Sequence, residues 1–466
     1  MQKTPPCTVG ALRDSGYRVL SVKEEMRKNL IAKIRGRVEL FPGIIGYDQT
    51  VIPQVENAIL SGQDMILLGE RGQAKTRIAR NLINLLDAEV PVIAGCEIND
   101  DPFAPICRAC KEKLDADGDA VAIDWLPRDR RYGEKLATPD ITIADLIGEV
   151  DPIKVAEGRY LSDELTIHYG LVPRTNRGIF CINELPDLAE RIQVGLLNIM
   201  EERDVQIRGY KVRLPLDLYV VASANPEDYT NRGRIITPLK DRIGSEIRTH
   251  YPLTIDHEVG IMKDESAHFV TDGYEVIVPK YISEMLAELT HLARKSPDIS
   301  QRSGVSVRVS ICNYENVISN ALRRAIRLEE KQVVPRITDL HAVMASTAGK
   351  IELETVGETK EERIIDRLVQ GATLAVFNRQ FAVPEFEDVI RAFAGGATYD
   401  AAEDLPAAQY VSQMQAVRAL RAGVAKLRAQ NSPAQVASAV EFILEGLHLN
   451  RKLNKDRGEG GSRYRG

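Results

Sequence analysis

The chain has 466 residues, of which 44% are hydrophobic and 5% aromatic, and its formal net charge is −6. This length suggests about two to four domains with an aliphatic core. The acidic balance argues against a protein built to coat nucleic acid, and no run of about 18 apolar residues predicts a membrane span. The N-terminus, MQKTPPCTVG, lacks the apolar segment of a secretory signal, and the chain has six cysteines. Cysteines without such a signal are typical of reduced thiols, so we expect a cytoplasmic protein.

A glycine-bearing loop, GERGQAKT, organises the first half of the chain. It follows the apolar run Met65–Leu68 and precedes Arg77–Ile83, whose apolar residues have helical spacing. Strand, loop and helix in this order are the context of a phosphate-binding loop, in which backbone N–H groups and a helix N-terminus converge on a polyphosphate. The residues expected to bind the nucleotide are Gly69, Glu70, Arg71, Gly72, Gln73, Ala74, Lys75 and Thr76.

Two side chains of this loop carry most of the expected chemistry. Lys75 would reach the β- and γ-phosphates of ATP, and the Thr76 hydroxyl would ligate Mg²⁺. Gly69 and Gly72 relieve the Cβ clash of a tight turn. Ala74 stands where the pattern G-x-x-x-x-G-K-[ST] has its second glycine, and we expect so small a side chain to be tolerated.

Strands that alternate with helices around this loop predict an α/β domain with a parallel sheet, whose ligand lies at the carboxyl ends of the strands. Residues 95–169 show no clear periodicity and are expected to be insertions. Residues 205–214 alternate around a glycine and predict a hairpin. The other predicted strands are Val90–Ala94, Gly178–Ile182, Leu218–Ser223 and Ser245–His250, and the helices are Val22–Val38, Thr50–Leu60 and Leu188–Glu201.

Beyond Pro252 the pattern becomes helical. A late helix begins at Ser432-Pro433, an N-cap followed by proline, and the polar stretch Thr355–Glu362 is expected to be a linker. Earlier helices are predicted at Tyr281–Arg294, Val305–Leu328 and Ile337–Ala348. We therefore expect an N-terminal helical lead-in (1–42), a nucleotide-binding core with insertions (43–252), a helical lid (253–350), a C-terminal helical region (351–450) and a disordered basic tail (451–466).

The stretch Gly178–Glu184, GIFCINE, is an apolar strand that ends in an acidic residue, as the second half of a nucleoside triphosphate site should. Glu184 is placed to orient and deprotonate the water that attacks the γ-phosphorus. Asn183 is expected to help hold Mg²⁺, but its amide carries no charge, so the affinity for Mg²⁺ is expected to fall. Asn225 ends the next strand, where its amide would hold the water or the γ-phosphate. The alternatives are a solvated carboxylate at Glu184 and a simple turn at Asn225-Pro226.

Arginines supply the remaining candidate site residues. Arg242, with Arg232 and Arg234 as competitors, would reach the γ-phosphate of a neighbouring subunit as an arginine finger. Arg308 would grip the γ-phosphate from the helical lid. Surface ion pairs are the alternative for each of them.

The chain resembles AAA+ ATPases of the magnesium-chelatase subunit I and MoxR clade over residues 40–350. The loop GERGQAKT, with alanine before lysine, is similar to MoxR-type loops. The rest of the resemblance rests on Asp145-Leu146-Ile147-Gly148 with Asp151, Gly158, Gly170-Leu171, Arg174 and Gly178, then Glu201-Glu202, Ser223-Ala224-Asn225-Pro226 and Leu239-Lys240-Asp241-Arg242.

This resemblance implies an AAA+ αβα nucleotide-binding domain followed by an α-helical lid, while the C-terminal helical segment has no counterpart. It implies ATP and Mg²⁺ as ligands, hydrolysis of ATP to ADP and phosphate, and a homo-oligomeric, hexameric ring. Sensor 1 would be Asn225, the arginine finger Arg242 and sensor 2 Arg308, whereas Asn183 replaces the usual aspartate of the family. It also implies a partner with a von Willebrand A-type domain, and remodelling or metal insertion in a partner complex.

Two other functions remain open on the same core. The first is a nucleic-acid motor or transcriptional activator, although the predicted hairpin has just Arg208, Lys211 and Arg213 as basic residues and nucleic acid is an unlikely ligand on this charge pattern. The second is a nucleotide-gated scaffold with little turnover, which the uncharged Asn183 motivates.

The cysteines form a separate pattern. Cys107-x-x-Cys110 has the spacing of a zinc knuckle, and Cys96 would supply a third thiolate. No second C-x-x-C pair and no nearby histidine completes four ligands, which favours plain reduced thiols. The arginine-rich stretch at 128–131 and the basic tail alternate with acids, which favours solvated faces over nucleic-acid contacts.

Overall fold

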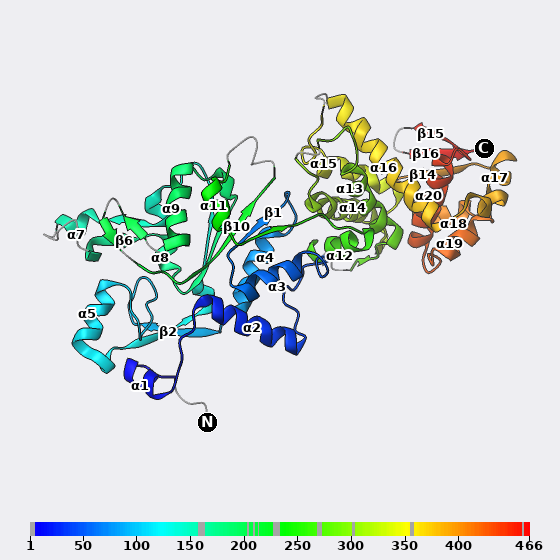
Figure 1. Cartoon of the computed structure of the whole chain (residues 1–466). Coiled ribbons are helices and arrows are strands. Elements are labelled where there is room, and N and C mark those ends of the chain that lie inside the picture. Colours follow the sequence, from blue (N-terminus) through cyan, green and yellow to red (C-terminus); the bar gives the residue numbers. More distant parts are fainter. Residues whose placement is uncertain are drawn as a thin grey trace. The chain divides into compact units, whose positions relative to one another are not determined.

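The chain divides into two compact units, Met1–His250 and Tyr251–Gly466, in a computed structural model of the protein (Figure 1). The predicted boundary between core and lid lies beside this division. The structure describes residues 5–156, 164–202, 205–207, 210–212, 214–226, 234–267, 273–300, 303–354, 358–458 and 461–466.

The first unit is built on a five-stranded parallel sheet with the order β11-β1-β10-β7-β4. This confirms the predicted α/β class with a parallel central sheet. Every residue of β1 and β7 is buried, which explains why these strands are continuous apolar runs in the sequence. The strands are β1 Met65–Leu68, β4 Tyr132–Leu136, β7 Gly178–Asn183, β10 Leu218–Ala224 and β11 Ser245–Arg248.

Helices cover both faces of this sheet, because successive strand residues point to opposite sides (Figure 1). Leu67 and Ile179 pack in one hydrophobic cluster with α2, α3 and α4, whereas Ile66 and Phe180 pack in another with α9 and α11. The expected lead-in helix is α2; it begins with a capping box at Ser21 and belongs to this core. These helices are α2 Val22–Gly36, α3 Val51–Ser61, α4 Lys75–Asn81, α9 Glu190–Glu202 and α11 Thr237–Arg242.

Two expectations about the sheet are wrong. The predicted strand at 90–94 forms β2 (Glu89–Ile93), but β2 pairs antiparallel with β3 (Ile123–Pro127) in a separate ribbon. The strand that completes the central sheet is β4, which lies within the stretch expected to be irregular. Its sequence, YGEKL, is polar because β4 is an edge strand, so hydrophobicity gave no signal for it.

The remaining elements of the first unit are short. The predicted hairpin is present as β8 (Val205–Ile207) and β9 (Tyr210–Val212), which pair antiparallel. Gly158, Arg208, Arg213 and Arg232 lie outside the described residues. The other elements are α1 Val9–Asp14, η1 Leu82–Leu85, α5 Arg108–Asp117, η2 Gly118–Ala120, η3 Arg128–Arg131, α6 Ile143–Leu146, β5 Gly148–Val150, α7 Pro152–Ala156, η4 Glu164–Thr166, β6 Ile167–Tyr169, α8 Leu171–Arg174 and η5 Leu185–Asp187.

The second unit is mostly helical and has one main hydrophobic core, which runs from Met262 to Tyr464. The regions expected as a lid and as a C-terminal segment therefore share that core. Ser432 caps α20 as predicted, but the predicted linker is helical from Glu358 onward and the helix predicted at 337–348 is divided into η6 and α15. The elements are α12 Ile255–Glu265, β12 Glu275–Val276, α13 Lys280–Ala293, α14 Val307–Arg327, β13 Gln332–Val333, η6 Ile337–Ala342, α15 Val343–Thr347, α16 Glu358–Gln380, η7 Val383–Phe386, α17 Glu387–Ala394, α18 Ala407–Gln413, α19 Leu420–Lys426 and α20 Pro433–Leu449.

The basic tail, expected to be disordered, is instead folded. Strands β15 (Asn454–Gly458) and β16 (Gly461–Arg465) form an antiparallel hairpin, and β16 also pairs with β14 (Tyr399–Ala402). Tyr464 is buried and donates a hydrogen bond of 2.5 Å to Glu445. The composition of the tail predicted disorder. The sequence shows the charges of the tail, but it does not show which residues on distant elements are their partners.

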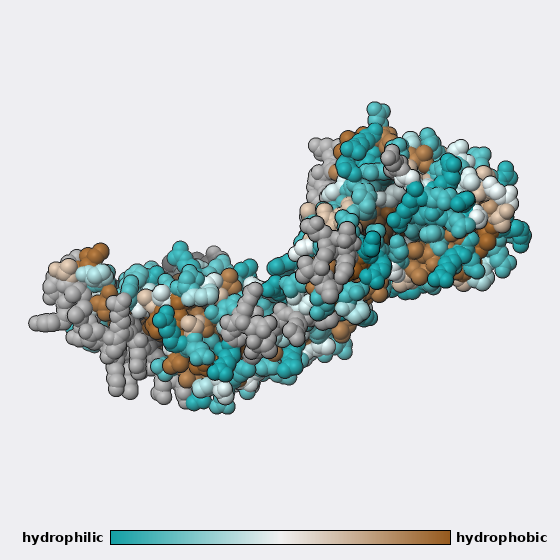
Figure 2. All heavy atoms as spheres, turned by 90° about the horizontal axis from the view of Figure 1, so that it is seen from above, coloured by the Kyte–Doolittle hydropathy of each residue, from teal (hydrophilic) through white to brown (hydrophobic). Residues whose placement is uncertain are grey.

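Figure 2 shows a mostly hydrophilic face, on which hydrophobic residues form small groups rather than one continuous patch. Among the helices that the structure describes, none combines the length and the apolar character needed to cross a bilayer.

Candidate nucleotide site

The predicted phosphate loop connects β1 to α4 at the carboxyl edge of the sheet, so the strand–loop–helix context is confirmed. Ala74 has left-handed backbone angles (φ 56°, ψ 15°), and Gly72 also has a positive φ of 78°. Glycine is preferred at such positions because a Cβ is strained there. The backbone of Ala74 is therefore strained. Glycine is usual at this position of the pattern because it adopts the left-handed conformation without that strain.

The loop is braced from two sides. Tyr47 donates hydrogen bonds to the carbonyls of Gln73 (3.0 Å) and His250 (2.6 Å), and burial raises its pKa to about 12. The Gln73 side-chain oxygen accepts from the Glu70 backbone N–H at 3.1 Å and from the Thr249 hydroxyl at 2.7 Å. These contacts fix the loop against the end of β11 before any ligand binds.

Lys75 is buried at the first turn of α4, and its ammonium group points back into the loop. It donates to the carbonyl of Gly69 and, at 3.0 Å, to that of Glu70. A third bond of 2.7 Å goes to Oδ1 of Asn225. An ammonium group directed into the centre of a phosphate loop is suited to meet an anionic oxygen.

The strand-end residues Asn225 and Glu184 lie side by side, as the parallel sheet predicted. Asn225 donates from Nδ2 to Glu184 Oε2 at 2.7 Å, so its amide joins Lys75 to Glu184 in one hydrogen-bonded chain. Glu184 itself has a left-handed φ of 56°. Strain of this kind persists where the surrounding structure holds a residue in place, and it occurs most often at functional sites.

Asn183 is buried next to Glu184, and both ends of its amide are engaged. Its Oδ1 accepts from the Ser223 hydroxyl at 3.1 Å, and its Nδ2 donates to Glu134 Oε1 at 2.7 Å. Glu134 also forms an ion pair of 2.8 Å with Arg80. A carboxylate is thus present beside Asn183, although it comes from another strand.

Sequence reasoning missed Glu134. It lies on β4, which is adjacent to β7 in the sheet, and residues 134 and 181 are partners in the register. No local motif marks it. Only recognition of β4 as the edge strand would have brought this carboxylate to the site.

A cavity of about 370 Å³ opens beside the loop, within the range of small-ligand sites. Gly69 and Glu70 line it on one side, and Lys240 and Arg248 contribute cationic side chains. Glu70 and Glu246 are also in the lining, and Arg248 pairs with Glu246 at 3.3 Å, so cationic and anionic side chains lie together next to the loop.

Two of the predicted arginines form ion pairs with acidic side chains. Arg242 ends α11 and pairs with its neighbour Asp241 at 3.0 Å. Arg234 pairs with Glu190 at 3.4 Å. Arg308 belongs to the second unit, where it is exposed in the first turn of α14.

The residues of the site fit ATP and Mg²⁺. The loop has glycine where a side chain would clash with Gln73 and Thr249, and a lysine directed into its centre. Thr76 lies half-buried in the first turn of α4, the position that a metal-ligating hydroxyl occupies in such loops. Glu134 adds an anionic oxygen of the kind that Mg²⁺ prefers.

Comparison with known proteins gives one curated relative, a magnesium-chelatase subunit ChlI homolog from Methanocaldococcus jannaschii. It is 29% identical over 212 residues, which are 44% of this chain and 53% of the relative. The chain thus spans about half the length of that protein. No protein-family model matches.

Solved structures with a similar fold include a model of the BchI–BchD complex of magnesium chelatase, which is 17% identical. The match covers 70% of this chain and 98% of that one, with a TM-score of 0.35. Another is Hsp104 with ATPγS and casein, 14% identical, covering 74% and 54%, with a TM-score of 0.40.

The sheet order, the phosphate loop and the strand-end residues give the first unit the αβα architecture of AAA+ domains. The chain is similar in sequence to a homolog of magnesium-chelatase subunit ChlI, in agreement with that part of the resemblance seen in the sequence.

Proposed function

We propose that this protein is an ATPase in which Lys75 binds the terminal phosphates and Glu184 acts as general base. The observation that supports this most is the hydrogen-bonded chain from Lys75 through Asn225 to Glu184. A γ-phosphate bound at Lys75 would compete with Asn225 Oδ1 for the hydrogen bond that the lysine ammonium donates. The Asn225 amide would then be released to hold the attacking water beside Glu184.

Mg²⁺, when bound, would neutralise charge on the phosphates, with Thr76 and Asn183 as the proposed residues that hold it. Burial of Asn183 and Lys75 limits the access of bulk water, which strengthens the interactions of these side chains with charge.

We further propose that the subunit works in a homo-oligomeric, hexameric ring. Arg242, the last residue of α11, would act as the arginine finger toward a neighbouring copy, and Arg308 would act as sensor 2. By analogy with the complex named for one structural neighbour, the ring would act on a partner protein, proposed to carry a von Willebrand A-type domain, and would remodel it or drive metal insertion.

A nucleotide-gated scaffold with little turnover is the second candidate. Asn183 contributes no charge, and the carboxylate of Glu184 is engaged by Asn225. The rate of ATP hydrolysis separates the two, because a scaffold would bind ATP and release almost no phosphate.

The test is ATP binding and phosphate release by wild type, Lys75→Ala and Glu184→Gln, with Lys263→Ala as the matched control on an exposed face of α12. Lys75→Ala should weaken ATP binding by at least about 100-fold, since charged hydrogen bonds are each worth about 1.5–3 kcal/mol. Glu184→Gln should bind ATP and lose turnover by about 10²–10⁴-fold. Near-normal ATP affinity in Lys75→Ala would show the loop assignment to be wrong.

A further inference from the structure

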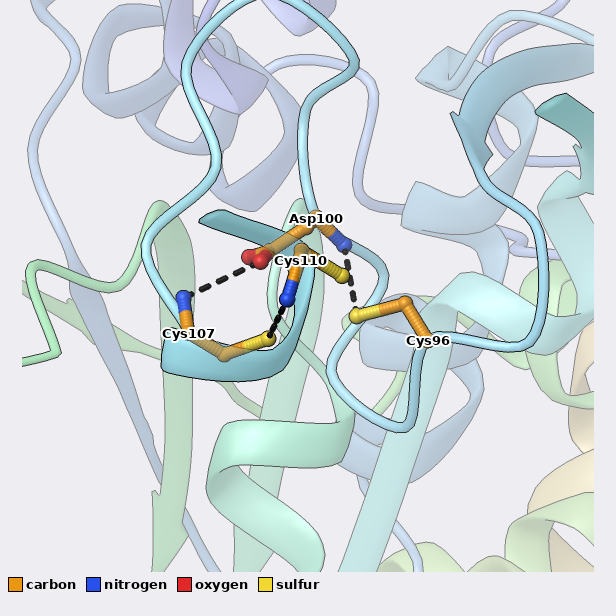
Figure 3. Close-up of side chains that lie close together, drawn as sticks. All are labelled: Cys96, Asp100, Cys107 and Cys110. Atoms are coloured by element: carbon orange, nitrogen blue, oxygen red, sulfur yellow. Dashed lines mark hydrogen bonds between the residues drawn. The ribbon is translucent and has the colours of Figure 1, made fainter. Parts of the chain in front are cut away.

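Three cysteines and one aspartate meet in the insertion between β2 and β3, away from the residues of the nucleotide site. One ligand atom each from Cys96, Asp100, Cys107 and Cys110 lies within 4.8 Å of the other three (Figure 3). The sequence offered three thiols and no fourth ligand. The fold supplies Asp100 as the fourth.

Local structure places these four side chains from two segments. Cys96 lies in the turn after β2, where its N–H donates to the carbonyl of Ile93 at 3.1 Å, and the Ile93 N–H in turn donates to the carbonyl of Asp100 at 3.2 Å. Cys107 is the N-cap residue of α5, and Cys110 lies in the first turn of that helix. A loop and a helix start therefore converge on one point.

Backbone N–H groups are already directed at the ligand atoms. The Asp100 N–H donates to Cys96 Sγ, and the Cys110 N–H to Cys107 Sγ, each at 3.4 Å. The Cys107 N–H donates to Asp100 Oδ2 at 3.0 Å. Donors of this kind orient metal ligands and stabilise negative charge on sulfur and oxygen.

The other carboxylate oxygen of Asp100 is the decisive observation. Asp100 is fully buried, and its Oδ1 has no hydrogen-bond partner. An unsatisfied buried polar atom costs about 1–3 kcal/mol, more when it is charged. A cation bound among the three sulfurs would satisfy it.

We propose that Cys96, Asp100, Cys107 and Cys110 bind one structural Zn²⁺ ion. Zinc binds thiolate sulfur at about 2.3 Å and carboxylate oxygen at about 2.0–2.2 Å in tetrahedral geometry, which places ligand atoms about 3.5–3.8 Å apart. The observed cluster needs only a small contraction to reach that arrangement. Three thiolates favour zinc over Mg²⁺, and four protein ligands leave no open position for catalysis, so the ion would be structural.

The ion would hold the irregular loop between β2 and α5 to the start of that helix. Cys107 and Cys110 belong to the same hydrophobic cluster as Ile98 and Ile123, so the site joins this loop to the core of the first unit. On binding, the thiols lose their protons to solvent. The proposal is independent of ATP hydrolysis, because none of its four residues belongs to the nucleotide site.

The experiment measures metal content in the full-length protein purified with reductant and without chelators. Wild type should contain about one zinc per chain. Cys110→Ser and Asp100→Asn should lower zinc content at least about tenfold, whereas Cys312→Ser, which changes a cysteine of the second unit, should keep it. Lys75→Ala should also keep its zinc, which separates this proposal from that of the ATPase.

A second measurement does not depend on the folding of variants. Wild-type protein freed of metal should bind Co²⁺ with the sulfur-to-cobalt charge transfer and intense visible bands of a tetrahedral thiolate site. Zinc should displace the cobalt, and zinc removal should expose residues 94–107 to protease. Wild type that contains no zinc and gives no cobalt spectrum would overturn the proposal, as would iron in place of zinc or a Cys107–Cys110 disulfide in the purified protein.

Discussion

Buried polar groups serve different purposes at the strand ends of the first unit and in the core of the second. At the strand ends, the neutral amide of Asn225 hydrogen-bonds to both Lys75 and Glu184, and Glu184 has a strained backbone. In the second unit, opposite charges touch directly. Arg324 and Asp339 pair at 2.9 Å, with side-chain exposures of 1% and 0%.

Further buried ion pairs of the second unit connect one helix to another. We call such a buried ion pair between elements a tie. Glu258 on α12 accepts two hydrogen bonds from Arg294, the C-cap residue of α13, at 2.6 and 2.9 Å, and one from Ser310 on α14. Although burial opposes it, hydrogen bonds from His291 and Arg294 lower the pKa of Glu258. The first unit has a similar tie away from the strand ends, between Arg131 and Glu25 at 2.6 Å.

This difference predicts which substitutions should change the activity of the protein and which should change its stability. Opposite charges that meet directly hold a fold together, and removal of one partner leaves an unpaired charge. Charges held apart by an amide can be redistributed when a ligand binds. Substitutions at the strand ends should therefore change turnover, and substitutions at the ties should change unfolding.

The largest expected effect belongs to Arg242→Ala. If this arginine acts across a subunit boundary, turnover should fall about 10³-fold or more while ATP binding persists. Mixing this variant with Glu184→Gln should restore some phosphate release, because some interfaces then have both intact residues. Arg327→Ala, an exposed change in α14, is the control. No recovery at any mixing ratio would contradict a shared site.

Arg324→Met tests the directly paired charges in the core of the second unit. Loss of one partner from a buried pair should lower the free energy of unfolding of the second unit by about 3–5 kcal/mol. Its neighbour Arg323 pairs with Glu403 at the surface, so Arg323→Met should cost only about 0–1 kcal/mol. Chemical denaturation of both variants decides this. Equal losses would mean that burial does not distinguish these two pairs.

Asn183→Asp tests whether the strand-end residues can exchange stability for metal binding, because it places a second carboxylate against Glu134. Loss of the 2.7 Å hydrogen bond should destabilise the protein without nucleotide by about 1–3 kcal/mol. Mg²⁺ with ATP should restore more stability to the variant than to wild type, since a divalent cation favours charged ligands. Addition of Glu134→Gln should relieve the repulsion.

Thermal unfolding with and without Mg²⁺ and ATP, together with Mg²⁺ titration of the ATPase rate, measures both effects. If Asn183→Asp and wild type have the same half-saturating Mg²⁺ concentration, residue 183 does not govern the metal.

Ala74→Gly should give the smallest effect and the opposite sign. Relief of the left-handed strain should stabilise the first unit by about 0.5–1 kcal/mol. Ala79→Gly, inside the same helix, should instead destabilise it by about 1 kcal/mol. Denaturation midpoints of the two variants provide the measurement, and a destabilising Ala74→Gly would show that the loop conformation stores no strain.

Much of the first unit was predictable because its signals are local. The spacing around Lys75 gave the phosphate loop, and the apolar strand before Glu184 gave its acidic partner. The expectation that Asn225 lies beside Glu184 followed from parallel pairing, and the structure confirms it.

The sequence by itself determined the phosphate loop, the apolar strands β1, β7 and β10 and the capped start of α20, because each depends on residues within a few positions of one another. Only the tertiary structure decided that β4 brings Glu134 to Asn183, that Asp100 joins three cysteines, and that the basic tail folds onto β14. Each of these contacts joins polar residues, and polar side chains leave no periodic pattern from which a partner can be identified.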